Sequence, residues 1–90
     1  MNVTFTDEGW DDYLEWFKAG DKKSIKKINE LVEDIKKNGL FVGIGKPEKL
    51  KYLDEDLYSR RISQGDRLIY CQDDTRGLII VSCRGHYGDK

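Results

Sequence analysis

The fold is decided by residues 57–84, which read LYSRRISQGDRLIYCQDDTRGLIIVSCR. Polar and apolar residues alternate in three runs typical of half-buried strands, namely Leu57–Ser63, Arg67–Gln72 and Leu78–Arg84. The segments between these runs, 64–66 and 73–77, contain Gly and Asp and have the lengths of hairpin loops. This stretch therefore predicts an antiparallel meander of three strands.

A short strand and two helices are predicted before the meander. Residues 1–6 alternate as a strand does, and Thr6 is placed to cap a helix that ends at Ala19-Gly20. The apolar stripe of that helix consists of Trp10, Tyr13, Leu14 and Phe17. A second helix runs from a cap at Asp21 to the stop at Asn38-Gly39. Its expected buried face consists of Ile25, Ile28, Leu31, Val32 and Ile35. The short connection predicts an antiparallel helix hairpin.

Residues 39–50, GLFVGIGKPEKL, contain three glycines and the only proline of the chain. We expect a loop here, followed by one helical turn with Pro47 near its start. Such a turn would place Glu48 on one face with Lys51, whose charge would keep the carboxylate ionised and able to act as a base. A solvated surface pair is the alternative interpretation of these two residues.

The composition is that of a soluble globular protein, with 38% hydrophobic and 37% charged residues among 90. We expect one α+β domain over residues 1–90. No apolar run approaches the roughly 20 residues of a membrane span and no signal peptide is evident, so the cytoplasm is the default location. Cys71 and Cys83 lie in apolar segments without metal-binding spacing. We interpret them as small buried thiols, with a disulfide or a catalytic thiol as alternatives.

The charge is unevenly distributed along the chain. The formal net charge is -1, yet residues 18–51 hold ten lysines against five acids, whereas residues 7–15 hold five acids and no basic residue. Because salt screens charges over about 8 Å, a basic face can meet phosphates while another face stays acidic. The lysine-rich middle is thus a candidate RNA surface, and a solvated helix face is the alternative.

Several residues of the second half could cut a phosphodiester through the RNA 2′-oxygen. That reaction needs a base, cations on the phosphate and an acid for the leaving oxygen, and no cluster with metal-ligand spacing is present. Alternation sends Arg60 and Arg61 to opposite faces, so one of them can meet a phosphate, and Arg67 opens the next strand. His86 can donate a proton near neutral pH, beside Tyr87. Taken singly, each of these residues is more often structural or inert.

Their joint pattern resembles the YoeB/Txe toxins of the RelE superfamily. The resemblance covers residues 1–87, and it is specific in order and spacing. The matching motifs are GWDDYL (9–14), KKINEL (26–31), GKPE (45–48), YSRRI (58–62), RLIY (67–70) and CRGHY (83–87). This chain departs from the family in Gly85, where an aromatic residue often precedes the histidine, and in the three residues 88–90.

The resemblance implies a RelE-like fold, with an N-terminal strand and a helix hairpin packed on a twisted antiparallel sheet. It also implies cleavage of messenger RNA in the ribosomal A site. We expect no metal or other cofactor, because side chains of the protein can supply the base, the cations and the acid. On the family pattern Glu48 is the general base, Arg67 the phosphate clamp and His86 the general acid. Lys51 and Arg61 are further phosphate contacts, and Tyr87 shapes the site.

The resemblance further implies partners. They are a YefM-type antitoxin, a second copy of the toxin in a homodimer, and operator DNA bound by the toxin–antitoxin complex. The alternative function is a module of the same fold that binds RNA or the ribosome without cutting. A pure protein-interaction domain would explain the fold equally well, but not the joint occurrence of Glu48, Arg67 and His86.

Overall fold

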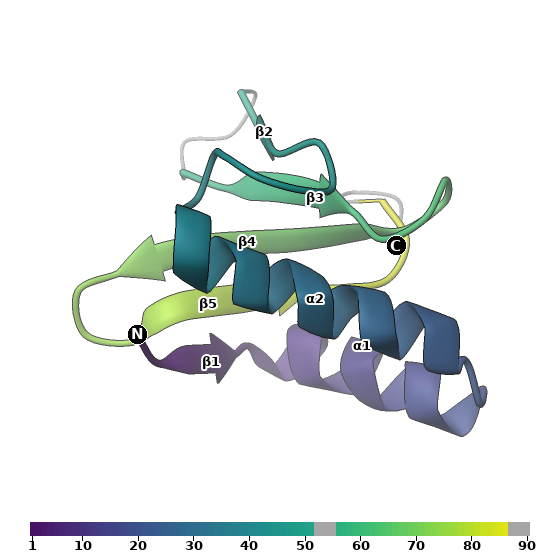
Figure 1. Cartoon of the computed structure of the whole chain (residues 1–90). Helices are drawn as coiled ribbons and strands as arrows, with labels where there is room; N and C mark the ends of the chain where they lie inside the picture. Colours follow the sequence, from purple (N-terminus) through teal and green to yellow (C-terminus); the bar gives the residue numbers. More distant parts are fainter. Residues whose placement is uncertain (52–55, 87–90) are drawn as a thin grey trace.

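The computed structural model describes residues 1–51 and 56–86, in which two helices pack on one sheet (Figure 1). The elements are β1 (Val3–Phe5), α1 (Asp7–Lys18), α2 (Lys22–Asn38), β2 (Glu48–Lys49), β3 (Tyr58–Arg61), β4 (Arg67–Asp73) and β5 (Gly77–Ser82). The predicted α+β class and the meander of β3, β4 and β5 are confirmed. In the described parts of the chain, no helix is both long and apolar enough to cross a bilayer.

The sheet is mixed rather than purely antiparallel. Its strand order is β1-β5-β4-β3-β2, and every neighbouring pair is antiparallel except β1 and β5. In that parallel pair Val3 lies opposite Leu78 and Phe5 opposite Ile80. A parallel pair requires a crossover between its strands, and the helices together with β2, β3 and β4 supply it.

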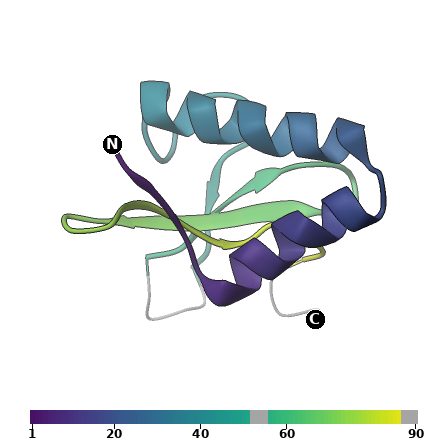
Figure 2. The same ribbon diagram turned by 90° about the horizontal axis from the view of Figure 1, so that it is seen from below.

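The helices cover one face of the sheet. They run in opposite directions and diverge from the turn at residues 19–21, and β1 leads directly into α1 (Figure 2). The caps are as predicted, since the side chains of Thr6 and Asp21 accept hydrogen bonds from Gly9 N and Ser24 N. The main core consists of Ile28, Leu31, Ile35, Ile62, Leu68, Tyr70, Leu78, Ile80 and Cys83. The predicted face of α2 is therefore confirmed at its centre, while Ile25 and Val32 are only half-buried.

The apolar stripe of α1 is only partly buried. Trp10 and Phe17 are 48% and 53% exposed, whereas Gly9 and Asp12 are the buried residues of this helix. The cause is the close approach of α1 to β5, because a Cβ atom at position 9 would collide with the carbonyl oxygen of Ile80. The helix is thereby turned so that its aromatic side chains form a row with one another and with a ring of β1. The row consists of Phe5, Trp10, Tyr13 and Phe17.

The predicted helical turn after Pro47 is also wrong. Glu48 and Lys49 form the edge strand β2, and the backbone N–H of Leu50 donates to the carbonyl of Leu57 at 2.9 Å. One isolated helical turn gains few hydrogen bonds, whereas the edge of β3 offers partners at once. Leu50 is also buried in a small second cluster with Leu57 and Ile69. Both effects favour the extended conformation.

The two cysteines differ in their environments. Cys83 is fully buried in the main core, and its Sγ lies 3.6 Å from the carbonyl oxygen of Gly9. Cys71 is half-buried and packs against the second cluster on the other face of the sheet. The expectation of a buried thiol is thus confirmed for Cys83 and only partly met at Cys71.

Candidate active site

Three predicted site residues share the face of the sheet opposite the helices. Glu48 lies directly opposite Ser59 in the β2–β3 pair, so both side chains point to the same side. Arg61 stands two residues beyond Ser59 on β3 and therefore shares that side. Arg67 lies directly opposite Arg61 in the β3–β4 pair. Strand register thus gathers one carboxylate and two guanidinium groups on one surface.

The neighbouring arginine has a different role. Arg60 stands between Ser59 and Arg61, so alternation turns it toward the helices, where it is fully buried and paired with Asp34 of α2 at 2.6 Å. Arg61 by contrast is exposed. The prediction that the two arginines point to opposite faces is therefore confirmed, and it leaves Arg61 as the one that can reach a phosphate.

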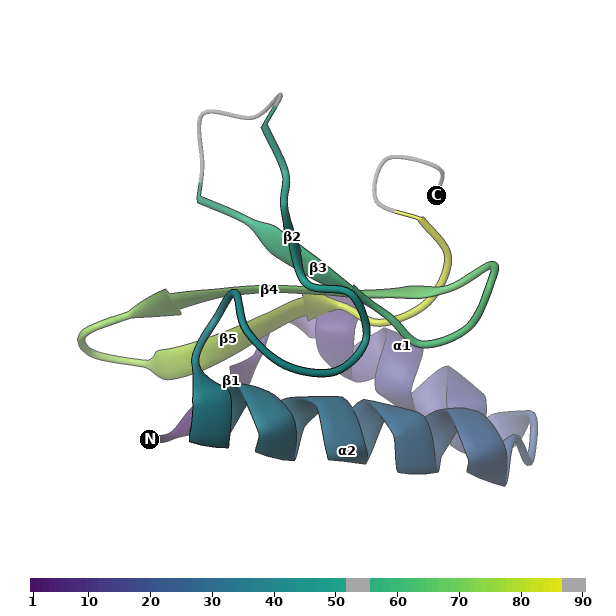
Figure 3. The same ribbon diagram turned by 45° about the horizontal axis from the view of Figure 1, so that its top comes forward.

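Strand register also sets how far the carboxylate lies from the arginine of β4. Glu48 lies on β2 and Arg67 lies on β4, two strands away. Their partners on β3, Ser59 and Arg61, are two residues apart. With strands about 4.8 Å apart and a rise of about 3.4 Å per residue, their backbones are separated by about 12 Å. The carboxylate and the two guanidinium groups thus start from one surface but not from adjacent positions (Figure 3 shows β2, β3 and β4 crossing above α2).

Arg67 is oriented by the turn between β3 and β4. Its Nη1 donates to three carbonyl oxygens, those of Ser63 at 2.8 Å, Gln64 at 3.2 Å and Asp66 at 3.1 Å. Among the described residues, Nε and Nη2 of this half-buried arginine have no hydrogen-bond partner. Two N–H groups on one edge of a guanidinium match two phosphate oxygens. The turn therefore holds the arginine in place and leaves one edge for an anion.

His86 is brought next to Arg67 by the backbone. The N–H of Arg67 donates to the carbonyl of Gly85 at 2.9 Å, and the N–H of Gly85 donates to Oδ1 of Asp66 at 2.8 Å. Gly85 has a φ of 73°, a conformation that favours glycine, and this accounts for a glycine before the histidine. His86 itself is half-buried. The chain after β5 thus turns back to the start of β4.

Asp66 is a residue that the sequence did not single out. Its carboxylate accepts hydrogen bonds from Gly85 N and from Ser63 Oγ, so it joins the segment before His86 to the turn that orients Arg67. An aspartate that follows a glycine between two strands is an ordinary turn residue. Its hydrogen bond with Gly85 could therefore not be predicted from the neighbouring residues.

The remaining predicted residues are less well defined. Lys51 is exposed and lies two residues beyond the end of β2. Because β2 is extended, the prediction that Lys51 shares a helical face with Glu48 is wrong. Tyr87 lies outside the described residues. Within residues 1–51 and 56–86, no three His, Cys, Asp or Glu side chains are grouped in a way that could hold a metal ion.

Comparison with known proteins shows the family. A family model described as the YoeB-like toxin of bacterial type II toxin-antitoxin systems matches residues 5–87. The chain is also 45% identical over 87 residues to Toxin YoeB of Escherichia coli K12, and the match covers 97% of this chain and 100% of the relative. The chain belongs to the YoeB toxin family.

Solved structures of YoeB proteins have the same fold. The YoeB dimer from Staphylococcus aureus is 48% identical, with a TM-score of 0.84, and the match covers 97% of this chain and 98% of that one. The YoeB–YefM complex from the same organism is 47% identical, with a TM-score of 0.83 and the same coverage. The mixed sheet with two helices is therefore the YoeB architecture.

Proposed function

We propose that this chain is an endoribonuclease that cuts messenger RNA in the ribosomal A site, with the 2′-hydroxyl of the RNA as nucleophile. Membership of the YoeB toxin family supports a toxin. The observation that carries the proposal is the register of β2, β3 and β4, which gathers Glu48, Arg61 and Arg67 on one face, with His86 tied to Arg67 through Gly85.

In this mechanism Glu48 accepts the proton of the 2′-hydroxyl. The 2′-oxygen then forms a bond to phosphorus while the bond from phosphorus to the 5′-oxygen breaks, and His86 donates a proton to that leaving oxygen. The products are a 2′,3′-cyclic phosphate and a 5′-hydroxyl. Arg67 stabilises the charge that builds on the phosphate, assisted by Arg61 and Lys51.

Protein side chains fill every role in this scheme, so we propose that neither a metal nor another cofactor takes part. Tyr87 is proposed to shape the site beside the histidine. Glu48 is exposed, and an exposed carboxylate is a weak base for a hydroxyl group. Ordering of the RNA strand in the A site can contribute several kcal/mol through orientation, which is why we propose that cleavage depends on the ribosome.

The lysine-rich face of α2 fits a ribosomal RNA surface. Five of its six lysines are exposed and one is half-buried, and they lie at both ends of the helix. The six are Lys22, Lys23, Lys26, Lys27, Lys36 and Lys37. We propose that these cations bring the toxin to the ribosome in the cytoplasm, where electrostatic steering raises the rate of encounter.

We also propose two protein partners. The solved S. aureus relatives include a YoeB dimer and a YoeB–YefM complex, and this chain is nearly half identical to both. By that similarity the chain forms a homodimer and binds a YefM-type antitoxin. Binding of the toxin–antitoxin complex to operator DNA is part of the same proposal.

The experiment is cleavage of a defined transcript in a purified translation system. The unmodified chain is expected to yield fragments with 5′-hydroxyl and 2′,3′-cyclic phosphate ends, and Glu48→Gln is expected to slow their appearance about 10²-fold or more. Glu15→Gln, which removes a partly exposed carboxylate of α1 paired with Lys18, is the matched control and should cut at the parent rate. A chain that binds ribosomes and leaves transcripts intact would instead be a non-catalytic module.

A further inference from the structure

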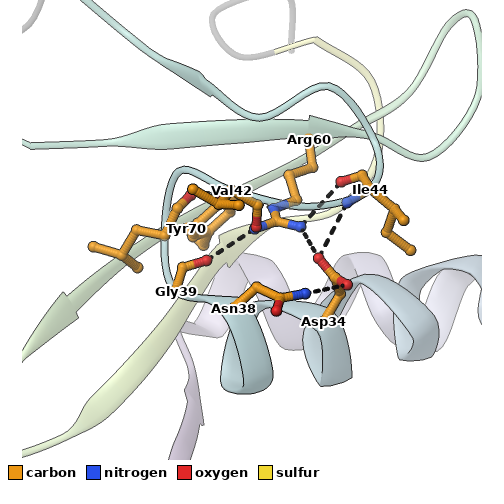
Figure 4. A network of polar contacts seen from close by, with 8 residues as sticks. Asp34, Asn38, Gly39, Val42, Ile44, Arg60 and Tyr70 are labelled. Carbon is orange, nitrogen blue, oxygen red and sulfur yellow. Dashed lines mark hydrogen bonds and ion pairs between the residues drawn. The ribbon is translucent and has the colours of Figure 1, made fainter.

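Arg60 is fully buried, and each of its five guanidinium N–H groups has a hydrogen-bond partner (Figure 4). Nε donates to the hydroxyl of Tyr70 at 2.9 Å, and Nη1 donates to the carboxylate of Asp34 at 2.6 Å. The other three bonds go to backbone carbonyls, those of Gly39 at 2.9 Å, Val42 at 2.8 Å and Ile44 at 3.0 Å.

Those three carbonyls belong to a single segment, residues 39–45, here called the base loop because it leads to the proposed general base Glu48. The partners of Arg60 hold the same loop, because Asp34 accepts from Ile44 N at 3.1 Å and Tyr70 Oη donates to Leu40 O at 2.5 Å. The loop ends where the N–H of Arg61 donates to Gly45 O at 2.7 Å. The base loop is thus bound by two adjacent residues of β3 and their partners.

Apolar contacts hold this loop at two side chains, because Leu40 packs against the main core and the ring of Phe41 contacts that of Tyr58. Its other large side chains are not buried, and Phe41, Val42 and Ile44 are 59%, 64% and 44% exposed. The conformation of the loop therefore depends largely on its polar contacts. The Asp34 carboxylate is kept ionised because Arg60 lowers its pKa, and burial raises the pKa of Tyr70, so that hydroxyl keeps the proton it donates.

The base loop leads directly to Glu48. Only Lys46 and Pro47 separate Gly45 from the proposed base, and proline restricts the backbone of both residues. Any displacement of the loop is therefore passed to the start of β2. Because β2 pairs with β3 at only two residues, its own hydrogen bonds fix its position weakly.

We propose that Arg60 is a positioning residue of this enzyme, which acts through the base loop to place Glu48 relative to Arg61 and Arg67. It does not touch RNA, since it is buried on the helix side of the sheet. Arg60 and Arg61 thus divide two tasks between adjacent positions of β3. Arg60 sets the position of the Glu48 carboxylate, and Arg61 faces the phosphate. This inference rests on the proposed function.

The first test is a double-mutant cycle of Arg60→Lys and Glu48→Gln, read as single-turnover cleavage on saturating ribosomes. Lysine keeps the charge but has three donors in place of five, so base-loop carbonyls lose partners. Arg60→Lys should slow the parent at least tenfold, and should slow Glu48→Gln hardly at all, because the misplaced base is already gone. Equal slowing in both backgrounds, or none in the parent, would overturn the inference.

A second variant avoids the risk that a buried arginine is needed for folding. A Cβ atom at Gly43 would collide with Oδ2 of Asp34 and stand 3.0 Å from Nη1 of Arg60, so Gly43→Ala disturbs the network from the exposed loop. Gly20→Ala is the control for a Cβ added at a positive φ, which is 69° at Gly20 and 128° at Gly43, because a Cβ at Gly20 meets nothing within 4 Å. Urea titration first shows that both variants are folded. Gly43→Ala should then cut about tenfold more slowly than the parent, and Gly20→Ala should cut within about twofold of the parent rate. Equal rates would contradict the proposal.

These experiments distinguish failure of the proposed ribonuclease function from failure of the positioning role of Arg60. If the unmodified chain cuts nothing, the proposed function fails and the positioning role falls with it. If Glu48→Gln slows cleavage but Arg60→Lys and Gly43→Ala do not, the ribonuclease stands and the positioning role alone is wrong.

Discussion

Arg61 and Arg67 lie directly opposite one another on β3 and β4, on the sheet face that also carries Glu48. Like charges that face each other across an antiparallel pair destabilise a sheet by a few tenths of a kcal/mol or more. An oxyanion between the two guanidinium groups would remove that repulsion. On the proposed function, this pairing favours binding of a phosphate at the expense of a small part of the stability.

Arg61→Gln should reduce the increase in Tm that an oxyanion such as sulfate produces. In chloride the variant should unfold at the same temperature as the parent or slightly higher, because one like-charge contact is gone. In sulfate the parent should gain more in Tm than the variant. Arg76→Gln, which removes an arginine at the opposite end of β4, is the control and should respond as the parent does. Identical sulfate responses of the parent and Arg61→Gln would contradict anion binding at this pair.

His86→Gln should slow cleavage about 10²-fold, the usual effect of losing a general acid, while ribosome binding is retained. The reason is its position, one residue from the Gly85 carbonyl that pairs with Arg67 N. Single-turnover rates and ribosome co-sedimentation measure the two effects separately. A variant that cuts at the parent rate would show that another group protonates the leaving oxygen.

Asp34→Asn should reduce the pH dependence of stability. Hydrogen bonding to Arg60 holds the pKa of Asp34 below its usual range, so the folded state binds that proton less readily than the unfolded state. The resulting stability is complete above about pH 5 and is lost as the pH falls through the folded-state pKa. The variant should therefore be less stable than the parent at pH 7 by at least about 1 kcal/mol, and the gap should narrow toward pH 3.

Urea unfolding at both pH values measures this gap. Asp73→Asn is the comparison, because the pKa of Asp73 is also lowered, chiefly by a hydrogen bond from Arg76 N, but on an exposed turn. Its effect on stability should be smaller than that of Asp34→Asn. A gap between the parent and Asp34→Asn that is the same at pH 7 and pH 3 would show that the Asp34 charge does not stabilise the fold.

The meander was predictable because its apolar alternation and its turn residues agree. The edges of the sheet were not. Two residues of β2 are too few for any periodicity, and the direction of β1 against β5 depends on the crossover rather than on local sequence. The exposure of the α1 stripe could not be read from its spacing, because Gly9, which lacks a side chain, is the point where that helix approaches β5.

The chemistry proposed for the candidate site comes from residue types and the family resemblance, whereas its geometry could not be predicted. Glu48, Arg67 and His86 stood out by their order along the chain. The placement of Glu48 and Arg67 on one face depends on strand register, and the path of the chain before His86 depends on one hydrogen bond to Gly85, and neither leaves a pattern in the sequence. Alternation separated Arg60 from Arg61 correctly, yet gave no sign that the buried one binds a whole loop.

The most direct test of the account is a map of transcript 5′ ends in cells that express the unmodified chain or His86→Gln. Cleavage in the ribosomal A site should produce new 5′-hydroxyl ends within translated regions, in a fixed phase with the codons, and His86→Gln should strongly reduce them. Transcript ends that show no fixed phase with the reading frame would contradict cleavage in the ribosomal A site. The same map from the unmodified chain and from His86→Gln would contradict the role of His86 in that cleavage.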